Sequence, residues 1–150
     1  MTVPSADDRR EIEECLYRYA WMVDQRKWEL MESVFTADGT IDYTSTGGKR
    51  GPYRPTLEWL DRALAGWPIN LHMISNISIE FPSPDVARSR CYFFAPMGRA
   101  GSDGAQDVIS NAGYYVDTLV RTRVGWRIRE RLCTQTIMIG QLPPGYVIPE

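Results

Sequence analysis

The sequence predicts an α+β fold in which about three N-terminal helices pack inside a strongly curved, mainly antiparallel sheet. Apolar residues recur at helical spacing up to about residue 64. From residue 72 onward, apolar and polar residues alternate in long runs that turn-forming residues separate, which is typical of an antiparallel meander. A twisted sheet wrapped around helices and open at one end forms a cone-shaped α+β barrel with a pocket inside. The 150 residues contain no repeat or linker, so we expect a single domain over residues 1–150.

The helices are expected in the first half of the chain. The first should begin after Ser5, a favourable N-cap residue, and end near Asp24. Its apolar residues at helical spacing are Ile12, Leu16, Tyr19, Ala20 and Val23. A short second helix is expected over residues 28–35, where an Ala-Asp-Gly sequence closes it. Pro55 suits the first turn of a third helix, whose apolar residues are Leu57, Leu60 and Leu64.

One strand is expected between the second and third helices, over residues 40–44, followed by a glycine-rich loop. The other strands are expected after the third helix, over residues 72–81, 86–97, 111–121 and 126–139. Residues 98–107 are predicted to form a flexible connection, because glycine and aspartate are frequent there.

Composition and missing motifs exclude several classes of function. A net charge of −2 argues against a nucleic-acid or anionic-membrane partner, since either favours a strongly basic face. There is no apolar signal region and no apolar run of transmembrane length, so we expect a cytoplasmic protein. The three cysteines form no CxxC pair and are expected to be reduced, buried thiols. With one histidine and no HExxH, P-loop or GxSxG sequence, we expect neither a metal nor another cofactor.

Asp24 and His72 are candidate catalytic residues, because a carboxylate that orients a neutral imidazole produces a general base. Each also has a purely structural interpretation. Asp24 could be a helix end in water, His72 a half-buried residue bonded to the backbone, and Tyr19 an ordinary core aromatic. Five arginines near the last hairpin could form a solvated strand face from which one points inward: Arg121, Arg123, Arg127, Arg129 and Arg131.

A longer pattern brings these residues together. Residues 19–39 read Y-x4-D-x3-W-x6-F-T-x-D-G, and the histidine follows the aspartate by 48 residues. This pattern resembles the SnoaL-like branch of the nuclear-transport-factor-2-like superfamily. The resemblance covers roughly residues 7–148, including the Pro-rich C-terminal segment. Within the branch, the motif is most similar to the γ-hexachlorocyclohexane dehydrochlorinases and the bile-acid 7α-dehydratases.

The resemblance implies roles for four residues. Asp24 and His72 match the Asp–His dyad of those lyases. Tyr19 falls where the dehydratases have an active-site tyrosine, and Arg131 falls where the dehydrochlorinases have an active-site arginine. Tyr19 and Asp24 are about 140° apart around a regular helix, so they can share a pocket only if the helix ends near Asp24.

The position of Arg131 poses a geometric problem. Strict alternation places it on the face of Arg127 and Arg129, opposite Trp126 and Ile128. An inward Arg131 therefore requires a bend or bulge in the strand, or a second subunit that covers Trp126 and Ile128. The lyases of this superfamily resemble trimers of that kind, which implies a homo-oligomer, with a trimer favoured over a dimer.

The residues and the resemblance together imply a cofactor-independent lyase, of dehydratase or dehydrohalogenase type, that acts on an apolar, ring-containing small molecule. His72 would remove a C–H proton while Asp24 orients its ring, and Tyr19 and Arg131 would stabilise the leaving group or a developing enolate. The candidate pocket residues are Trp21, Trp28, Tyr43, Leu71, Phe93, Phe94, Tyr115 and Ile137. Two alternatives stay open: a double-bond isomerase of the ketosteroid type, and a non-catalytic binding protein of the same fold.

Overall fold

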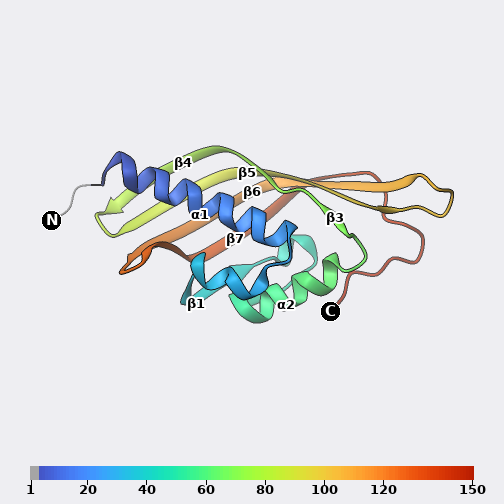
Figure 1. The fold of residues 1–150 in the computed structure, drawn as a ribbon, viewed down its shortest axis with the longest axis horizontal. Coiled ribbons are helices and arrows are strands. Elements are labelled where there is room, and N and C mark those ends of the chain that lie inside the picture. Colours follow the sequence, from blue (N-terminus) through green and yellow to red (C-terminus); the bar gives the residue numbers. More distant parts are fainter. Residues whose placement is uncertain (1–3) are drawn as a thin grey trace.

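The structure, a computed structural model, describes residues 4–150. In chain order, its elements are α1 (Ala6–Asp24), η1 (Trp28–Ser33), β1 (Phe35–Asp42), η2 (Thr44–Thr46), β2 (Arg50–Pro52), α2 (Tyr53–Leu64), β3 (Ile69–Asn70), β4 (Met73–Ser83), β5 (Val86–Ala100), β6 (Gln106–Thr122) and β7 (Gly125–Ile139). Figure 1 shows α1 lying across the long strands β4 to β7, with η1, α2 and β1 beside it.

The strands form one curved sheet in the order β2-β1-β7-β6-β5-β3, with β4 also paired to β5. The pairs are antiparallel, apart from β1 and β7, which run parallel. The predicted class, helices packed against a strongly curved and mainly antiparallel sheet, is confirmed.

Several boundaries differ from those predicted. Residues 28–33 form the 3-10 helix η1, and β1 begins at Phe35 rather than at residue 40. The short strands β2 and β3 were not predicted. Both ends of the expected flexible connection are strand and only residues 101–105 lie outside it, because the β5–β6 ladder continues to the pair Ala100 and Gln106. Cross-strand pairing outweighs the weak local propensity of the glycine-rich sequence there.

The core lies between α1 and the sheet. The apolar stripe of α1 is buried as its helical spacing predicts, with Ile12, Cys15, Leu16, Tyr19 and Val23 at 0–1% exposure. All three cysteines are buried and free, as expected. Among the described residues, no helix has the length and apolar character needed to cross a membrane.

Asp8 fixes the start of α1 to the sheet. It forms a capping box with Ser5, in which the Ser5 amide donates to Asp8 Oδ2 at 2.8 Å and the Asp8 amide donates to Ser5 Oγ at 3.2 Å. Asp8 Oδ1 accepts from Arg121 Nη1 on β6 at 2.6 Å and from Trp126 Nε1 on β7 at 3.0 Å. These bonds, that from Arg121 foremost, hold the pKa of the Asp8 carboxyl well below its usual range.

A β-bulge reverses the faces of β7. Thr118 pairs with Glu130 and Leu119 with Ile128, which leaves Arg129 without a partner on β6. Before the bulge, Trp126 and Ile128 are buried, whereas Arg131 is buried after it. Of the two explanations considered for an inward Arg131, the bulge is correct. Trp126 and Ile128 need no second subunit to cover them, because they lie inside this chain's own core.

We expect the Asp8→Asn substitution to destabilise the fold by about 2 kcal/mol at pH 7, because two donors lose a charged acceptor. The folded-state pKa of Asp8 is depressed, so its contribution is complete above the unfolded pKa of about 3.9 and is lost as the pH falls below it. The difference in Tm between the two proteins should therefore shrink below about pH 4 in calorimetry.

Asp7→Asn is the matched control, because Asp7 is an exposed acid in the same helical turn. Equal Tm losses in Asp7→Asn and Asp8→Asn would contradict the role given to the Arg121 and Trp126 contacts.

Candidate active site

A cavity of about 420 Å³ lies between β5, β6 and β7 on one side and α2 on the other. The C-terminal segment after β7 covers part of it, since Leu142, Tyr146 and Ile148 line the cavity. Two hydrogen bonds hold this segment against α2, from Trp59 Nε1 to the Pro149 carbonyl at 2.7 Å and from the Tyr146 hydroxyl to the Ala63 carbonyl at 3.0 Å. A volume of this size suits a small cyclic molecule.

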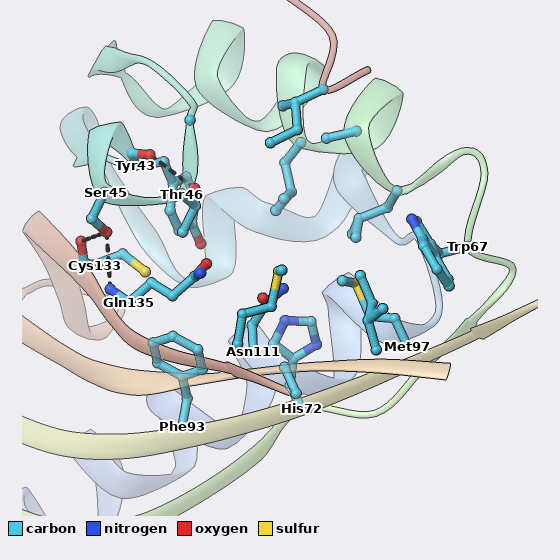
Figure 2. A pocket seen from close by; sticks show the side chains of 18 of the residues that line it. Tyr43, Ser45, Thr46, Trp67, His72, Phe93, Met97, Asn111, Cys133 and Gln135 are labelled. Carbon is cyan, nitrogen blue, oxygen red and sulfur yellow. Dashed lines mark hydrogen bonds between the residues drawn. The ribbon is translucent and has the colours of Figure 1, made fainter. Parts of the chain in front are cut away.

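The cavity wall is mainly apolar. Its aromatic members are Tyr43, Trp59, Trp67, Phe93, Tyr115 and Tyr146. Its polar members are His72, Asn111, Gln135, Ser45 and Thr46, and Figure 2 shows these side chains around the hollow. No Asp, Glu, Lys or Arg lines this cavity among the residues that the structure describes.

Asp24 holds His72 at two points. His72 lies in the short gap between β3 and β4, and its backbone amide donates to Asp24 Oδ2 at 2.9 Å. Its ring atom Nδ1 lies 2.6 Å from Asp24 Oδ1. The two side chains are only 10% and 14% exposed. With Nδ1–H donating to the carboxylate, the neutral imidazole keeps the lone pair of Nε2 free, and His72 lines the cavity.

The end of α1 explains why Asp24 can reach His72. Asp24 is the last residue of α1, so its side chain extends over the helix end. Arg26, just beyond, donates to the carbonyls of Leu64 at 2.7 Å and Trp67 at 3.0 Å, which fixes the helix end beside the end of α2.

Tyr19 lies behind the cavity wall rather than in it. Its side chain is completely buried, and its hydroxyl hydrogen-bonds the hydroxyl of Tyr43, which does line the cavity. Burial raises the pKa of Tyr19. The structure therefore does not bring Tyr19 beside Asp24 in one pocket, and the cavity-lining hydroxyl of this pair is that of Tyr43.

Arg131 also lies one layer behind the cavity. Nε and Nη2 donate to the two oxygens of Asp117, each at 2.8 Å, and both side chains are fully buried. The guanidinium carbon is 4.2 Å from the ring centre of Tyr19 and 4.1 Å from that of Tyr115. Burial alone would lower the pKa of Arg131, but the Asp117 carboxylate outweighs it and raises that pKa. The expectation that Arg131 reaches the pocket is corrected, because its guanidinium forms a buried ion pair with Asp117 behind the cavity wall.

Three of the predicted pocket residues line the cavity, namely Tyr43, Phe93 and Tyr115. The other five do not: Trp21, Trp28, Leu71, Phe94 and Ile137. Strand alternation explains Phe94, whose side chain lies on the face of β5 opposite to that of Phe93. Leu71 lies in the gap between β3 and β4, and its side chain is 56% exposed.

The other three side chains lie away from the cavity for separate reasons. Trp21 lies on the outer side of α1 and is 66% exposed. Trp28 Nε1 donates to Asp61 at 2.8 Å, away from the cavity. A second bulge leaves Thr136 unpaired between the pairs Gly113–Gln135 and Ala112–Ile137, so Ile137 faces outward.

Sequence reasoning missed several cavity residues. Asn111 and Gln135 could have been noticed as amides within otherwise apolar alternating strands, whereas the contribution of the C-terminal segment had no local signal. Cys133 also lines the cavity, but burial raises the pKa of its thiol to about 12, so it is protonated and a poor nucleophile.

We expect Arg131→Met to destabilise the fold by about 3–5 kcal/mol, because it leaves the Asp117 carboxylate buried without a counter-charge. The double variant Arg131→Met with Asp117→Leu should recover most of that loss, as denaturant unfolding would measure. Arg129→Met is the control, since Arg129 is exposed at the bulge and should change stability by less than about 0.5 kcal/mol. If the double variant were no more stable than Arg131→Met, the ion pair would not be the reason for the loss.

The SnoaL-like domain family matches residues 4–132. An uncharacterized protein of Mycobacterium tuberculosis is 38% identical over 141 residues, which cover 92% of this chain and 94% of that protein.

Solved structures share the fold. A protein from Kribbella flavida is 26% identical with a TM-score of 0.78, covering 89% of this chain and 93% of its own. A protein from Novosphingobium aromaticivorans, provisionally named scytalone dehydratase, is 23% identical with a TM-score of 0.75, and the match covers 95% of this chain and 99% of that protein. The hexachlorocyclohexane dehydrochlorinase LinA-type3 from Novosphingobium barchaimii is 20% identical with a TM-score of 0.71, and the match covers 93% of this chain and 100% of that protein. Because the family match spans most of the chain, this protein belongs to the SnoaL-like domain family of the nuclear-transport-factor-2-like superfamily.

Proposed function

We propose that this protein is a cofactor-independent lyase, of dehydratase or dehydrohalogenase type, that acts on an apolar cyclic small molecule. The observation that carries the proposal is the two-point hold of Asp24 on His72, which leaves Nε2 free at an apolar cavity. Solved structures with the same fold as this protein include proteins named as a dehydratase and as dehydrochlorinases, which supports elimination chemistry on this fold.

In the proposed reaction, Nε2 of His72 takes a proton from a substrate carbon. The C–H electrons become the new double bond, and the bond from the neighbouring carbon to its oxygen or halogen breaks. Asp24 keeps the ring oriented and stabilises the imidazolium that forms, which is the role of the carboxylate in an Asp–His pair. A halide leaves as the anion, whereas a hydroxyl takes up a proton and leaves as water.

The proton donor for a departing hydroxyl is proposed to be Tyr43, with Tyr19 behind it. Tyr43 lines the cavity, and its hydroxyl bonds that of Tyr19. The sequence suggested Tyr19 as the residue that stabilises the leaving group. In this proposal, Tyr19 instead acts indirectly, by hydrogen-bonding the hydroxyl of Tyr43. The C-terminal segment covers part of the apolar cavity, and hydrogen bonds in such a low-dielectric environment are stronger than in bulk water.

Arg131 is proposed as a positioning residue. Its guanidinium stacks between Tyr19 and Tyr115, so it holds one ring that supports Tyr43 and another that lines the cavity. It contacts neither the cavity nor a leaving group placed there, which separates this role from direct stabilisation of an anion.

A double-bond isomerase remains the second candidate. Asn111 lines the same cavity as His72, and its amide could donate to a substrate carbonyl as an enolate forms (Figure 2). The two reactions differ in product mass: an isomerase product has the mass of the substrate, whereas an elimination product is lighter by water or a hydrogen halide. A binding role alone gives no reason for an oriented base.

A homo-oligomer, with a trimer favoured, stays a prediction. Exposed apolar side chains on the outer face of the sheet support it: Tyr92, Phe94, Leu132 and Ile137 are 38–57% exposed.

We expect Asp24→Asn to lower the elimination rate by about 10²–10⁴-fold on a panel of neutral hydroxylated and halogenated cyclic compounds. The Asn amide would donate to Nδ1 and force the proton onto Nε2, which blocks the base. His72→Ala should abolish turnover while the Tm changes by only a few degrees. Product formation would be followed by mass spectrometry.

Glu58→Gln is the control, because Glu58 is an exposed acid on α2 and should leave the rate unchanged. Full activity in Asp24→Asn would remove the dyad from the mechanism. Collapse of the fold in His72→Ala would assign His72 a structural role instead.

A further inference from the structure

The turn that follows α1 contains an arginine in a conformation that favours glycine. Arg26 has a φ angle of +54°, in the left-handed region that side chains rarely adopt. The amide of Arg26 donates to the Val23 carbonyl at 3.1 Å, and the amide of Lys27 donates to the Met22 carbonyl at 2.8 Å. This is the Schellman pattern of a helix C-terminus, in which the left-handed position is usually glycine. Because such backbone strain persists only where other contacts hold it, the contacts of the Arg26 side chain are expected to offset it.

The guanidinium of Arg26 binds the end of α2 and the segment after it. Nη2 donates to the Leu64 carbonyl at 2.7 Å and to the Trp67 carbonyl at 3.0 Å. Leu64 is the last residue of α2, and a cation is stabilising at the negative end of a helix dipole. Nη1 lies 3.5 Å from Asp61 Oδ1, an oxygen that also accepts from Trp28 Nε1 at 2.8 Å. The side chain therefore joins the turn after α1 to α2 and its following segment at three points.

The Trp67 carbonyl begins the short segment that leads to His72. Asn70 Nδ2 donates to the same carbonyl at 2.5 Å. The next amide, that of Leu71, donates to a carbonyl of β5 at 3.1 Å, and His72 follows it. Few bonds separate the Arg26 contact from His72, so the position of the Trp67 carbonyl constrains that of the imidazole.

Two residues at the end of α1 thus hold the segment between α2 and β4 at both of its ends. Asp24 contacts the amide and the ring of His72, and Arg26 binds the carbonyls of Leu64 and Trp67. Figure 1 shows this end of α1 beside α2 and β3. Because hydrogen bonds fix the turn between Asp24 and Arg26, the Arg26 contacts determine where the Asp24 carboxylate lies relative to His72.

On the basis of the proposed function, we propose that Arg26 is a positioning residue for the Asp24–His72 pair. Arg26 does not line the cavity, so it does not contact a substrate placed there. Its guanidinium keeps the Asp24 carboxylate within hydrogen-bonding distance of both the amide and the ring of His72. This role accounts for an arginine at a backbone position that glycine would occupy without strain.

The test compares Arg26→Gly with the natural protein. Glycine favours the left-handed backbone, so the turn after α1 should keep its shape while the guanidinium contacts are lost. The relief of strain and the loss of hydrogen bonds oppose each other, so the Tm should change by only a few degrees. We expect kcat for elimination to fall about 10- to 100-fold, as a displacement of a base by about 1 Å produces.

A second measurement does not depend on turnover. The His72 amide donates to Asp24, whereas the preceding amide, that of Leu71, donates to β5. In Arg26→Gly, NMR hydrogen exchange of the His72 amide should become at least about tenfold faster relative to that of Leu71, because only the His72 bond opens more often. The His72 ring, the single imidazole of the chain, should change from the Nδ1–H form to a mixture of tautomers.

Lys27→Ala is the matched control, because Lys27 is an exposed cation in the same turn. This variant should keep the rate, the ratio of the two exchange rates and the ring signal of the natural protein. If Arg26→Gly does not fold, Arg26→Asn replaces it, since asparagine also tolerates the left-handed region.

An unchanged ratio of exchange rates in Arg26→Gly would overturn the proposal, whatever the rate of turnover. Equal acceleration of both amides would also overturn it, because Arg26 would then stabilise the fold as a whole. If the ratio changes but the natural protein eliminates nothing from the substrate panel, the positioning role stands and the lyase mechanism is rejected. An active lyase with an unchanged ratio would keep the lyase and reject this role for Arg26.

Discussion

The hydrogen bonds from His72 to Asp24 join the fold to the proposed chemistry. The last residue of α1 contacts both the backbone amide and the ring of the residue before β4, so the same residue joins the helix to the sheet and favours the imidazole tautomer with its proton on Nδ1. Because His72 lies in the gap between β3 and β4, its amide has no place in the sheet ladder, and Asp24 satisfies it. In the proposed function, Nε2 of His72 then faces a cavity that no described Asp, Glu, Lys or Arg lines.

Two bulges in β7 arrange the rest of the site. The first, at Arg129, turns Arg131 and Cys133 inward after Ile128; the second, at Thr136, follows Gln135. Between them, β7 supplies the buried ion pair that supports the tyrosines and the amide that faces the cavity. A continuous ladder with strict alternation could not place Trp126, Ile128, Arg131 and Gln135 on one side of the sheet.

The sequence predicted the fold class and the end of α1 well, because the helical stripe and the long alternating runs are strong periodic signals. It also identified Asp24 and His72, which the structure places within hydrogen-bonding distance. Periodicity failed where the ladder is irregular. Ile137 was assigned to the pocket because a bulge cannot be located from alternation alone. Arg131 was assigned to the site from the family resemblance, which gave no sign of its partner Asp117 on another strand. Tyr43 was assigned to the wall, but its bond to Tyr19 depends on packing that no local pattern encodes.

The tautomer of His72 is the most direct measurement of the central claim. The chain has one histidine, so a ¹⁵N spectrum of the labelled, untagged protein contains a single imidazole. Long-range ¹⁵N–¹H correlation distinguishes which ring nitrogen carries the proton in the neutral form. Our account predicts the proton on Nδ1, facing Asp24, with Nε2 unprotonated toward the cavity. A neutral ring that carries its proton on Nε2 would contradict it, because that nitrogen could not then act as the base.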